Sequence, residues 1–358
     1  MNSSDDDELK FEIGRIITGF SPFILIFLSF ILNSLNFYIY SQETFAKTSA
    51  TFYLKALAIF DTLSLLQNFS FSLPYSFGID LKVQTVAMCK ILNSLGFSVC
   101  AVSSWLETIV SIDRCLSIAY INKFSFLNKR WFKYLVLSIA IAFNFVYYLP
   151  IIIFFDVVTI TNTNTTEDSK SCVTMDELYS SILGWSDLVN STFMPFLLMF
   201  VSTIVIVRSL VSSRKRSSSS HKQPKMAPKP ATQQSSYMHG SSGVDLNIKS
   251  ATTATASSST NTSIKKSSKS REEKEFQFAL VSVTMNILFF FFNLFLCIYN
   301  IYSSYVQMSP GDSLLFFSLA SLLFNINFTF KFFIYYIINT KFRAEVHNTI
   351  ALIKKTFI

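Results

Sequence analysis

The stretch from residue 103 to residue 115 decides the fold, and it reads Ser-Ser-Trp-Leu-Glu-Thr-Ile-Val-Ser-Ile-Asp-Arg-Cys. The pair Asp113-Arg114 closes a mostly apolar segment that is long enough to span a bilayer. Charged side chains at that depth are costly unless they meet water or a protein partner at the membrane surface. The stretch therefore predicts a membrane-spanning helix that delivers Asp113 and Arg114 to the cytoplasmic surface.

The composition extends this prediction to the whole chain. Of the 358 residues, 51% are hydrophobic and 39 are phenylalanine, which is more apolar surface than a soluble monomer tolerates. A membrane helix needs about 20 mainly apolar residues. Seven segments qualify: 16–40, 51–75, 89–118, 131–154, 180–209, 276–302 and 313–338. Barrel strands are shorter and alternate in polarity, so we expect an all-α membrane protein, a seven-transmembrane helix bundle.

The placement of lysine and arginine predicts the orientation. Most of the 30 basic residues follow helices one, three and five or lie in the tail, whereas residues 5–8 are acidic. We therefore expect a multi-pass plasma-membrane protein with an extracellular N-terminus. The net charge of +8 reflects the basic residues of the cytoplasmic loops and tail, so nucleic-acid binding is not expected. The predicted organisation is an extracellular N-terminus (1–15), transmembrane helices one to five (16–210), a disordered, Ser- and Thr-rich third inner loop (211–274) and helices six and seven (275–340). A short amphipathic eighth helix with the cytoplasmic tail follows (341–358), and we expect this helix to lie on membrane lipids.

Other motifs accompany the Asp-Arg pair. Helix two reads Leu-Lys-Ala-Leu-Ala-Ile-Phe-Asp over residues 54–61, helix one carries a polar Asn33, helix five has Pro195, and helix seven ends with Tyr335. In these residues the chain resembles the rhodopsin-like (class A) G-protein-coupled receptors, and the resemblance covers all seven helices. It implies a receptor that converts the binding of an extracellular ligand into activation of a heterotrimeric G protein by a movement of helix six.

The chain also departs from the family pattern. Thr203 stands where helix five usually has Tyr, Asn293 and Phe295 replace the Trp and Pro of helix six, and Lys331 replaces the Asn of helix seven. In Asn293 and in the missing final Pro of helix seven, the chain is similar to invertebrate neuropeptide receptors of the FMRFamide type.

Lys331 is the sharpest departure. A retinal-binding lysine would make the chain an opsin, but opsins carry that lysine six residues earlier, where this chain has Asn325, about 9 Å away along the helix axis. Residues 103, 107 and 114 share one helix face, and residues 327, 331 and 335 share another. We expect Lys331 to pair with Asp61, Glu107 or both, and the alternative is a lysine that faces lipid.

The resemblance gives this pairing a role. Family members bind a sodium ion between residues that match Asp61, Ser103 and Lys331, so we expect the lysine ammonium to replace the ion. The expected intramembrane polar cluster comprises Asn33, Asp61, Ser103, Glu107, Asn327 and Lys331.

The resemblance also implies a switch at the cytoplasmic end. Its residues are Asp113, Arg114, Glu275 and Tyr335. An Arg114–Glu275 ion pair would hold helices three and six together at rest, and the alternative is that Glu275 is a solvated charge at a loop end. Kinases and arrestin are expected to act at the Ser- and Thr-rich third inner loop, and the alternative is that this loop is only a tolerated insertion.

Five cysteines divide by position. Cys89 opens helix three and Cys172 lies in the second outer loop, so we expect a disulfide between them, with two free thiols as the alternative. The sequons at Asn2 and Asn164 fall on the predicted outer face and are expected to carry glycans.

The ligand class is the least constrained property. Amine receptors carry an Asp where this chain has Gly96, which disfavours a biogenic amine. The expected ligand pocket is aromatic and mostly uncharged, and it comprises Phe97, Cys100, Asn293, Tyr299 and Phe324. Acidic outer segments attract cationic ligands, which favours a neuropeptide; a chemosensory small-molecule receptor and a non-signalling decoy receptor are the alternatives. The histidines are His221, His239 and His347, and they form no cluster, so we expect no enzyme, metal or cofactor.

Overall fold

The computed structural model describes residues 3–46, 49–119, 125–161, 168–220 and 257–357. Within these ranges, seven helices are long and apolar enough to cross a membrane: Asp5–Ser41, Ser49–Phe77, Val86–Ala119, Arg130–Phe154, Glu177–Ser209, Ala279–Ser303 and Pro310–Ile338. Each overlaps one predicted span, so the prediction of a seven-helix membrane bundle is confirmed.

The spans are built from the following elements: α1 (Ser3–Ser41), α3 (Ser49–Phe77), α4 (Val86–Ala119), α5 (Arg130–Tyr147) with α6 (Ile151–Phe154), α7 (Glu177–Asp187) with the π-helix η3 (Leu188–Phe193) and α8 (Met194–Ser220), α9 (Ser257–Tyr305) and α10 (Pro310–Ile338). Short connections are formed by α2 (Glu43–Ala46), η1 (Leu81–Val83) and η2 (Ser125–Asn128). The central helix is α4, which packs against α3, α5, α8 and α9.

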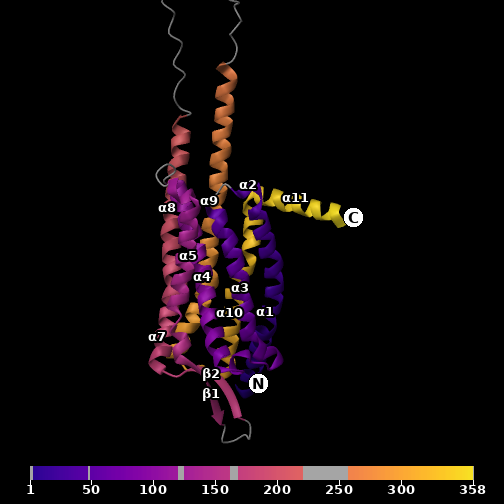
Figure 1. The fold of residues 1–358 in the computed structure, drawn as a ribbon, viewed down its shortest axis with the longest axis vertical. Helices are drawn as coiled ribbons and strands as arrows, with labels where there is room; N and C mark the ends of the chain where they lie inside the picture. Colours follow the sequence, from indigo (N-terminus) through magenta and orange to yellow (C-terminus); the bar gives the residue numbers. More distant parts are fainter. Residues whose placement is uncertain (1–2, 47–48, 120–124, 162–167, 221–256, 358) are drawn as a thin grey trace, which may run out of the picture.

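The two ends of the bundle differ. A β-hairpin and the N-terminus lie at one end, which we call the hairpin end; α2 and α11 (Thr340–Phe357) lie at the other, the α11 end (Figure 1). The predicted eighth helix is present as α11, which projects across the bundle axis (Figure 1). Its Phe342 is fully buried and packs against the rings of Tyr40 and Tyr335, which anchors α11 to the bundle.

The hairpin adds strands to a fold predicted to be all-α. Strands β1 (Phe155–Thr161) and β2 (Asp168–Thr174) pair antiparallel, with Val157 opposite Cys172. Cys172 forms a disulfide with Cys89 near the start of α4, so the hairpin is tied to the central helix. Each strand has only seven residues, and the hairpin mixes apolar with polar side chains, so it lacks the long apolar run that identified the helices. The sequons at Asn2 and Asn164 lie outside the described residues.

The fifth span contains an irregularity at the predicted kink. Pro195 has no backbone N–H, so it cannot complete the regular hydrogen-bond ladder of an α-helix. The six residues before Met194 form the π-helix η3, and the Met194 N–H donates to the Val189 carbonyl, five residues back. The wider turn inserts one extra residue into the helix.

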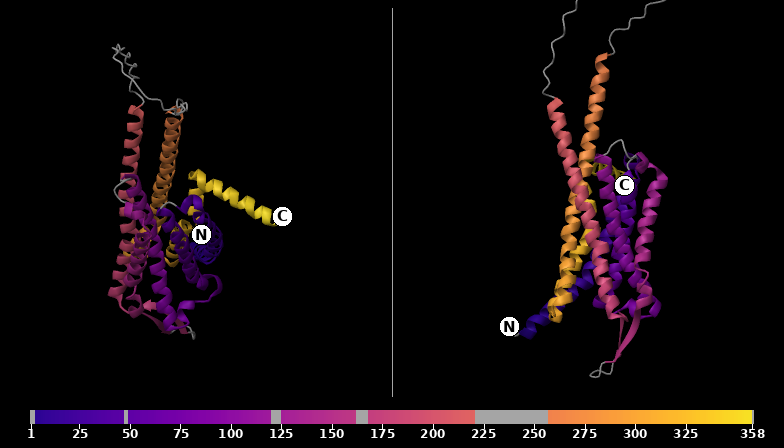
Figure 2. Two further views of the ribbon diagram at one scale, coloured as in Figure 1. Left: turned by 45° about the horizontal axis from the view of Figure 1, so that its top comes forward. Right: turned by 90° about the vertical axis from the view of Figure 1, so that its left-hand side faces the viewer.

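Helices α8 and α9 continue past the bundle at the α11 end, side by side (Figure 2). Helix α8 ends at Ser220, ten residues after the predicted boundary at 210, and α9 begins at Ser257, well before the predicted boundary at 275. The Lys, Arg and Glu residues at these ends are good helix formers. Residues 221–256, most of the predicted inner loop, lie outside the described residues.

Candidate functional site

Three charged side chains meet inside the bundle. Lys331 on α10 places its Nζ 3.0 Å from Asp61 Oδ1 on α3 and 3.0 Å from Glu107 Oε2 on α4. The three side chains are at most 3% exposed. Ser103, one turn from Glu107, donates a hydrogen bond to the same Asp61 oxygen. The lysine therefore contacts both carboxylates, and its register points it into the bundle rather than toward lipid.

The two carboxylates are not equally satisfied. Asp61 accepts hydrogen bonds from Ser103 and Lys331. Glu107 approaches Lys331 as an ion pair, but neither of its oxygens has a hydrogen bond from the described residues. With all three groups ionised, this triad (Asp61, Glu107 and Lys331) has a net charge of −1. Buried charges are stable only when paired and hydrogen-bonded, so Glu107 is the weaker member.

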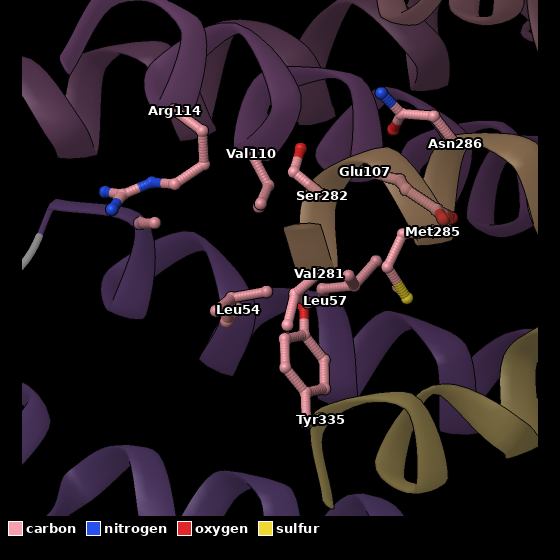
Figure 3. Close-up of a pocket in the computed structure, with 11 residues that line it drawn as sticks. Leu54, Leu57, Glu107, Val110, Arg114, Val281, Ser282, Met285, Asn286 and Tyr335 are labelled. Carbon is pink, nitrogen blue, oxygen red and sulfur yellow. The ribbon is translucent and has the colours of Figure 1, made fainter. Parts of the chain in front are cut away.

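A cavity of about 20 Å³ lies between the triad and the α11 end. Glu107 and Arg114 lie at opposite sides of it, and Tyr335 also lines it (Figure 3). A cavity of this size admits about one water molecule. The cavity thus lies between Glu107 of the triad and the arginine of the Asp-Arg pair, and its lining is mostly apolar.

The Asp-Arg pair is buried at the α11 end of α4. Arg114 Nη2 donates to Asp113 Oδ2 at 2.6 Å and to Ser49 Oγ on α3 at 3.3 Å, and Ser49 itself donates to Asp113 at 2.8 Å. These three residues join α3 and α4. Glu275, the predicted partner of Arg114, lies in the helical backbone of α9, but its side chain is outside the described residues.

Two further predicted members of the cluster have different surroundings. Asn33 on α1 donates to Ser29, to Thr62 on α3 and to the Phe328 carbonyl on α10, so it joins three helices. Asn327 on α10 is buried; no contact with the triad is seen for it among the described residues.

Asn286 on α9 was missed by the sequence analysis. Its Nδ2 donates to Ser111 Oγ on α4 at 2.9 Å, and to the Met199 carbonyl at 3.2 Å and Thr203 Oγ1 at 2.7 Å on α8. Thr203 was identified only as a departure from a usual Tyr; the structure gives it a partner. An Asn in an apolar helix was the available signal, because such a residue needs hydrogen bonds inside a membrane.

A larger cavity of about 570 Å³ lies nearer the hairpin end. Of the five predicted pocket residues, Phe97, Cys100 and Phe324 line it, and Asn293 and Tyr299 do not. Asn293 is buried and donates to the Phe289 carbonyl of its own helix. Tyr299 stacks on Phe316 of α10. Asn293 and Tyr299 are therefore engaged by other protein groups and not by the cavity.

The lining of this cavity is mostly uncharged but also includes charged side chains. Its described lining includes Asp80, Lys82 and Asp187, none of which was among the predicted site residues. Lys82 in η1 places its Nζ 3.8 Å from the centre of the Phe71 ring. Burial lowers the pKa of the Lys82 ammonium, and the nearby Asp80 carboxylate partly offsets this shift.

Among the described residues, no group of three or more His, Cys, Asp or Glu side chains is arranged to hold a metal ion. In a comparison with protein families, the sequence model of the family "7 transmembrane receptor (rhodopsin family)" matches residues 32–338. No curated protein matches the chain. The match spans the triad, the Asp-Arg pair, the small cavity and all of the large cavity's described lining except Thr18, Ser21 and Pro22.

Proposed function

The chain belongs to the rhodopsin family of seven-transmembrane receptors, and from this premise we propose that it converts the binding of an extracellular neuropeptide into activation of a heterotrimeric G protein. As a member of that family it is a receptor of the plasma membrane with several membrane spans and is not an enzyme. The observation that carries the signalling proposal is the buried Asp113–Arg114 pair at the α11 end of α4.

The proposed orientation has the hairpin end outside the cell. Residues 5–8 are acidic, whereas α11 carries Lys341, Arg343, Lys354 and Lys355. Basic residues near the ends of membrane helices favour the cytoplasmic side. The disulfide at the hairpin end supports the same orientation, because disulfides persist in oxidising compartments.

In the proposed mechanism the described arrangement is the resting state. Arg114 is engaged by Asp113 and Ser49. Ligand binding in the 570 Å³ cavity favours a state in which α9 moves away from α4, and Arg114 then contacts the G protein. Glu275 on α9 is the proposed additional partner of Arg114 at rest. Asn286 supports this role for α9, since its hydrogen bonds to α4 and α8 must break when α9 moves.

Lys331 is proposed to replace the sodium ion of related receptors. Its Nζ is 3.0 Å from both carboxylates, which is the position a bound cation would take. The receptor would then carry its own cation at the centre of the switch, and its resting state would not depend on sodium.

The neuropeptide assignment rests on the acidic character of the proposed outer surface. Asp176 and Glu177 are exposed at the hairpin end, and residues 5–8 are acidic. Such surfaces attract cationic ligands. A chemosensory small molecule is the second candidate, favoured by a cavity volume within the range of about 300–1,000 Å³ that is usual for small-molecule sites.

The test is a G-protein activation assay on the full chain in cells, screened with a library of neuropeptides. We expect a peptide to activate the receptor, and Arg114→Ala to abolish activation at equal surface expression. Arg130→Ala is the matched control, because Arg130 is exposed at the same end of the bundle. Signalling by Arg114→Ala at the wild-type level, or no ligand-dependent or constitutive activity at all, would refute the proposal and leave a decoy receptor.

A further inference from the structure

The large cavity has an unbalanced charge. Its described charged residues are Asp80, Lys82 and Asp187. Asp80 and Lys82 belong to the same turn, where the Asp80 carboxylate accepts a hydrogen bond from the Lys82 backbone N–H at 2.9 Å. The carboxylate also raises the pKa of the Lys82 ammonium by electrostatic attraction, so the two charges offset one another. In the part of the chain that the structure describes, Asp187 forms no ion pair within 4.0 Å. The cavity therefore has one excess negative charge, at Asp187.

Asp187 is held in place by a chain of hydrogen bonds. The Tyr148 hydroxyl donates to Asp187 Oδ1 at 2.6 Å. Asn190 Nδ2 donates to the Tyr148 hydroxyl at 3.3 Å and to Asn144 Oδ1 at 3.0 Å, and Trp105 Nε1 donates to Asn190 Oδ1 at 3.1 Å. Because a carboxylate has about four acceptor positions, the Tyr148 bond leaves most of them for a group in the cavity.

The α4 wall of the cavity is crowded at Gly96. A Cβ atom at Gly96 on α4 would lie 3.1 Å from Gln67 Cγ and 3.2 Å from a carbon of the Phe71 ring, both on α3. These distances are shorter than ordinary van der Waals contacts, so a side chain at position 96 would have to displace the side chains of Gln67 and Phe71. The acidic residues of the described lining are Asp80, which lies beside Lys82, and Asp187, so recognition of a positive charge falls to Asp187 at the end of α7.

We propose that Asp187 binds a positively charged group of the ligand, a guanidinium or an ammonium. This inference rests on the proposed function, because it takes the 570 Å³ cavity as the ligand site. The aromatic ring of Phe97, which lines the cavity and stacks on Tyr148 with ring centres 5.6 Å apart, provides an apolar surface beside the carboxylate. The pocket thus fits a cation attached to an apolar or aromatic body.

The test measures binding without signalling. Purified full-length receptor in lipid nanodiscs is heated with N-benzoyl-argininamide, which is cationic, or with its neutral counterpart N-benzoyl-citrullinamide, at millimolar concentrations. We expect the cationic probe to raise the unfolding temperature of the wild-type receptor more than the neutral probe does. Asp187→Asn should weaken binding of the cationic probe about 30-fold or more, the fold-change that corresponds to the loss of a buried charge pair.

Glu43→Gln is the matched control, since it removes one negative charge from an exposed position in α2 at the α11 end of the bundle, away from the cavity, and should leave the probe affinity unchanged. The wild-type comparison of the two probes needs no variant, so the proposal stays testable if Asp187→Asn does not fold. Equal effects of the two probes on the wild type, or wild-type affinity for the cationic probe in Asp187→Asn, would overturn it. Such a result would leave G-protein activation, which is measured in cells with peptides, unaffected.

Discussion

Replacing Lys331 with Asn tests the central feature of the bundle, since it removes the cation and restores the residue that related receptors carry. Each Nζ–carboxylate distance is 3.0 Å; at an effective dielectric constant of about 20, each attraction is about 5.5 kcal/mol before desolvation is counted. Desolvation offsets much of this, and removing one partner of a buried pair costs about 3–5 kcal/mol. We therefore expect a large loss of stability in Lys331→Asn.

Sodium should restore part of that loss. The variant leaves Asp61, Ser103 and Glu107 around an uncompensated site, which resembles the sodium pocket of related receptors. A sodium concentration of about 100 times Kd would return about 2.7 kcal/mol. The wild-type receptor should gain nothing specific from sodium, because the ammonium already occupies the position between the carboxylates.

The assay is thermal unfolding of full-length receptor in nanodiscs, in sodium chloride and in choline chloride at equal ionic strength. Lys55→Asn is the control: it makes the same substitution on α3, at a lysine that lies 5.9 Å from the centre of the Phe37 ring and is partly exposed. A wild-type receptor that responds to sodium as strongly as Lys331→Asn, or a Lys331→Asn receptor as stable as Lys55→Asn, would refute the reasoning.

A second substitution in the Lys331→Asn background identifies the carboxylate that holds the ion. Asp61 shares a hydrogen bond with Ser103, whereas Glu107 has no hydrogen bond from the described residues. We expect Asp61→Asn to remove the sodium response and Glu107→Gln only to weaken it. If Glu107→Gln reduced the sodium response more than Asp61→Asn in the same assay, the cation would bind nearer to α4 than we expect.

Two further substitutions test the packing around the switch. Asn286→Ala should cost about 1–3 kcal/mol, because it leaves the buried Met199 carbonyl and the partly buried Thr203 hydroxyl without their donor. Thermal unfolding measures the loss, and a stability equal to the wild type would contradict it. Cys172→Ser should cost about 4 kcal/mol, because the disulfide closes a loop with a sequence separation of 83 residues. Surface expression and unfolding temperature measure this loss, and no change in either would contradict it.

The seven spans could be predicted because the length and polarity of an apolar run are local properties of the sequence. The contacts of Lys331 were also accessible, because a charged residue in an apolar helix needs a partner and helical spacing limits the candidates to Asp61 and Glu107. The bonds of Asn286 were not accessible in the same way. Its partners lie on two other helices, and their distances depend on how α8 and α9 pack, which no spacing within one helix reveals.

Asp187 escaped the sequence analysis for a geometric reason. The inward face of α8 includes Pro195, Met199, Ser202 and Ile206, all buried. In a regular helix, with about 100° per residue, a residue eight positions before Pro195 would point about 80° away from that face. The π-helix before Met194 absorbs one extra residue, so Asp187 behaves as if it were seven positions away and lies within about 20° of the inward face. Counting back from Pro195 along an ideal helix therefore places this carboxylate at the side of the helix, whereas the π-helix turns it into the cavity.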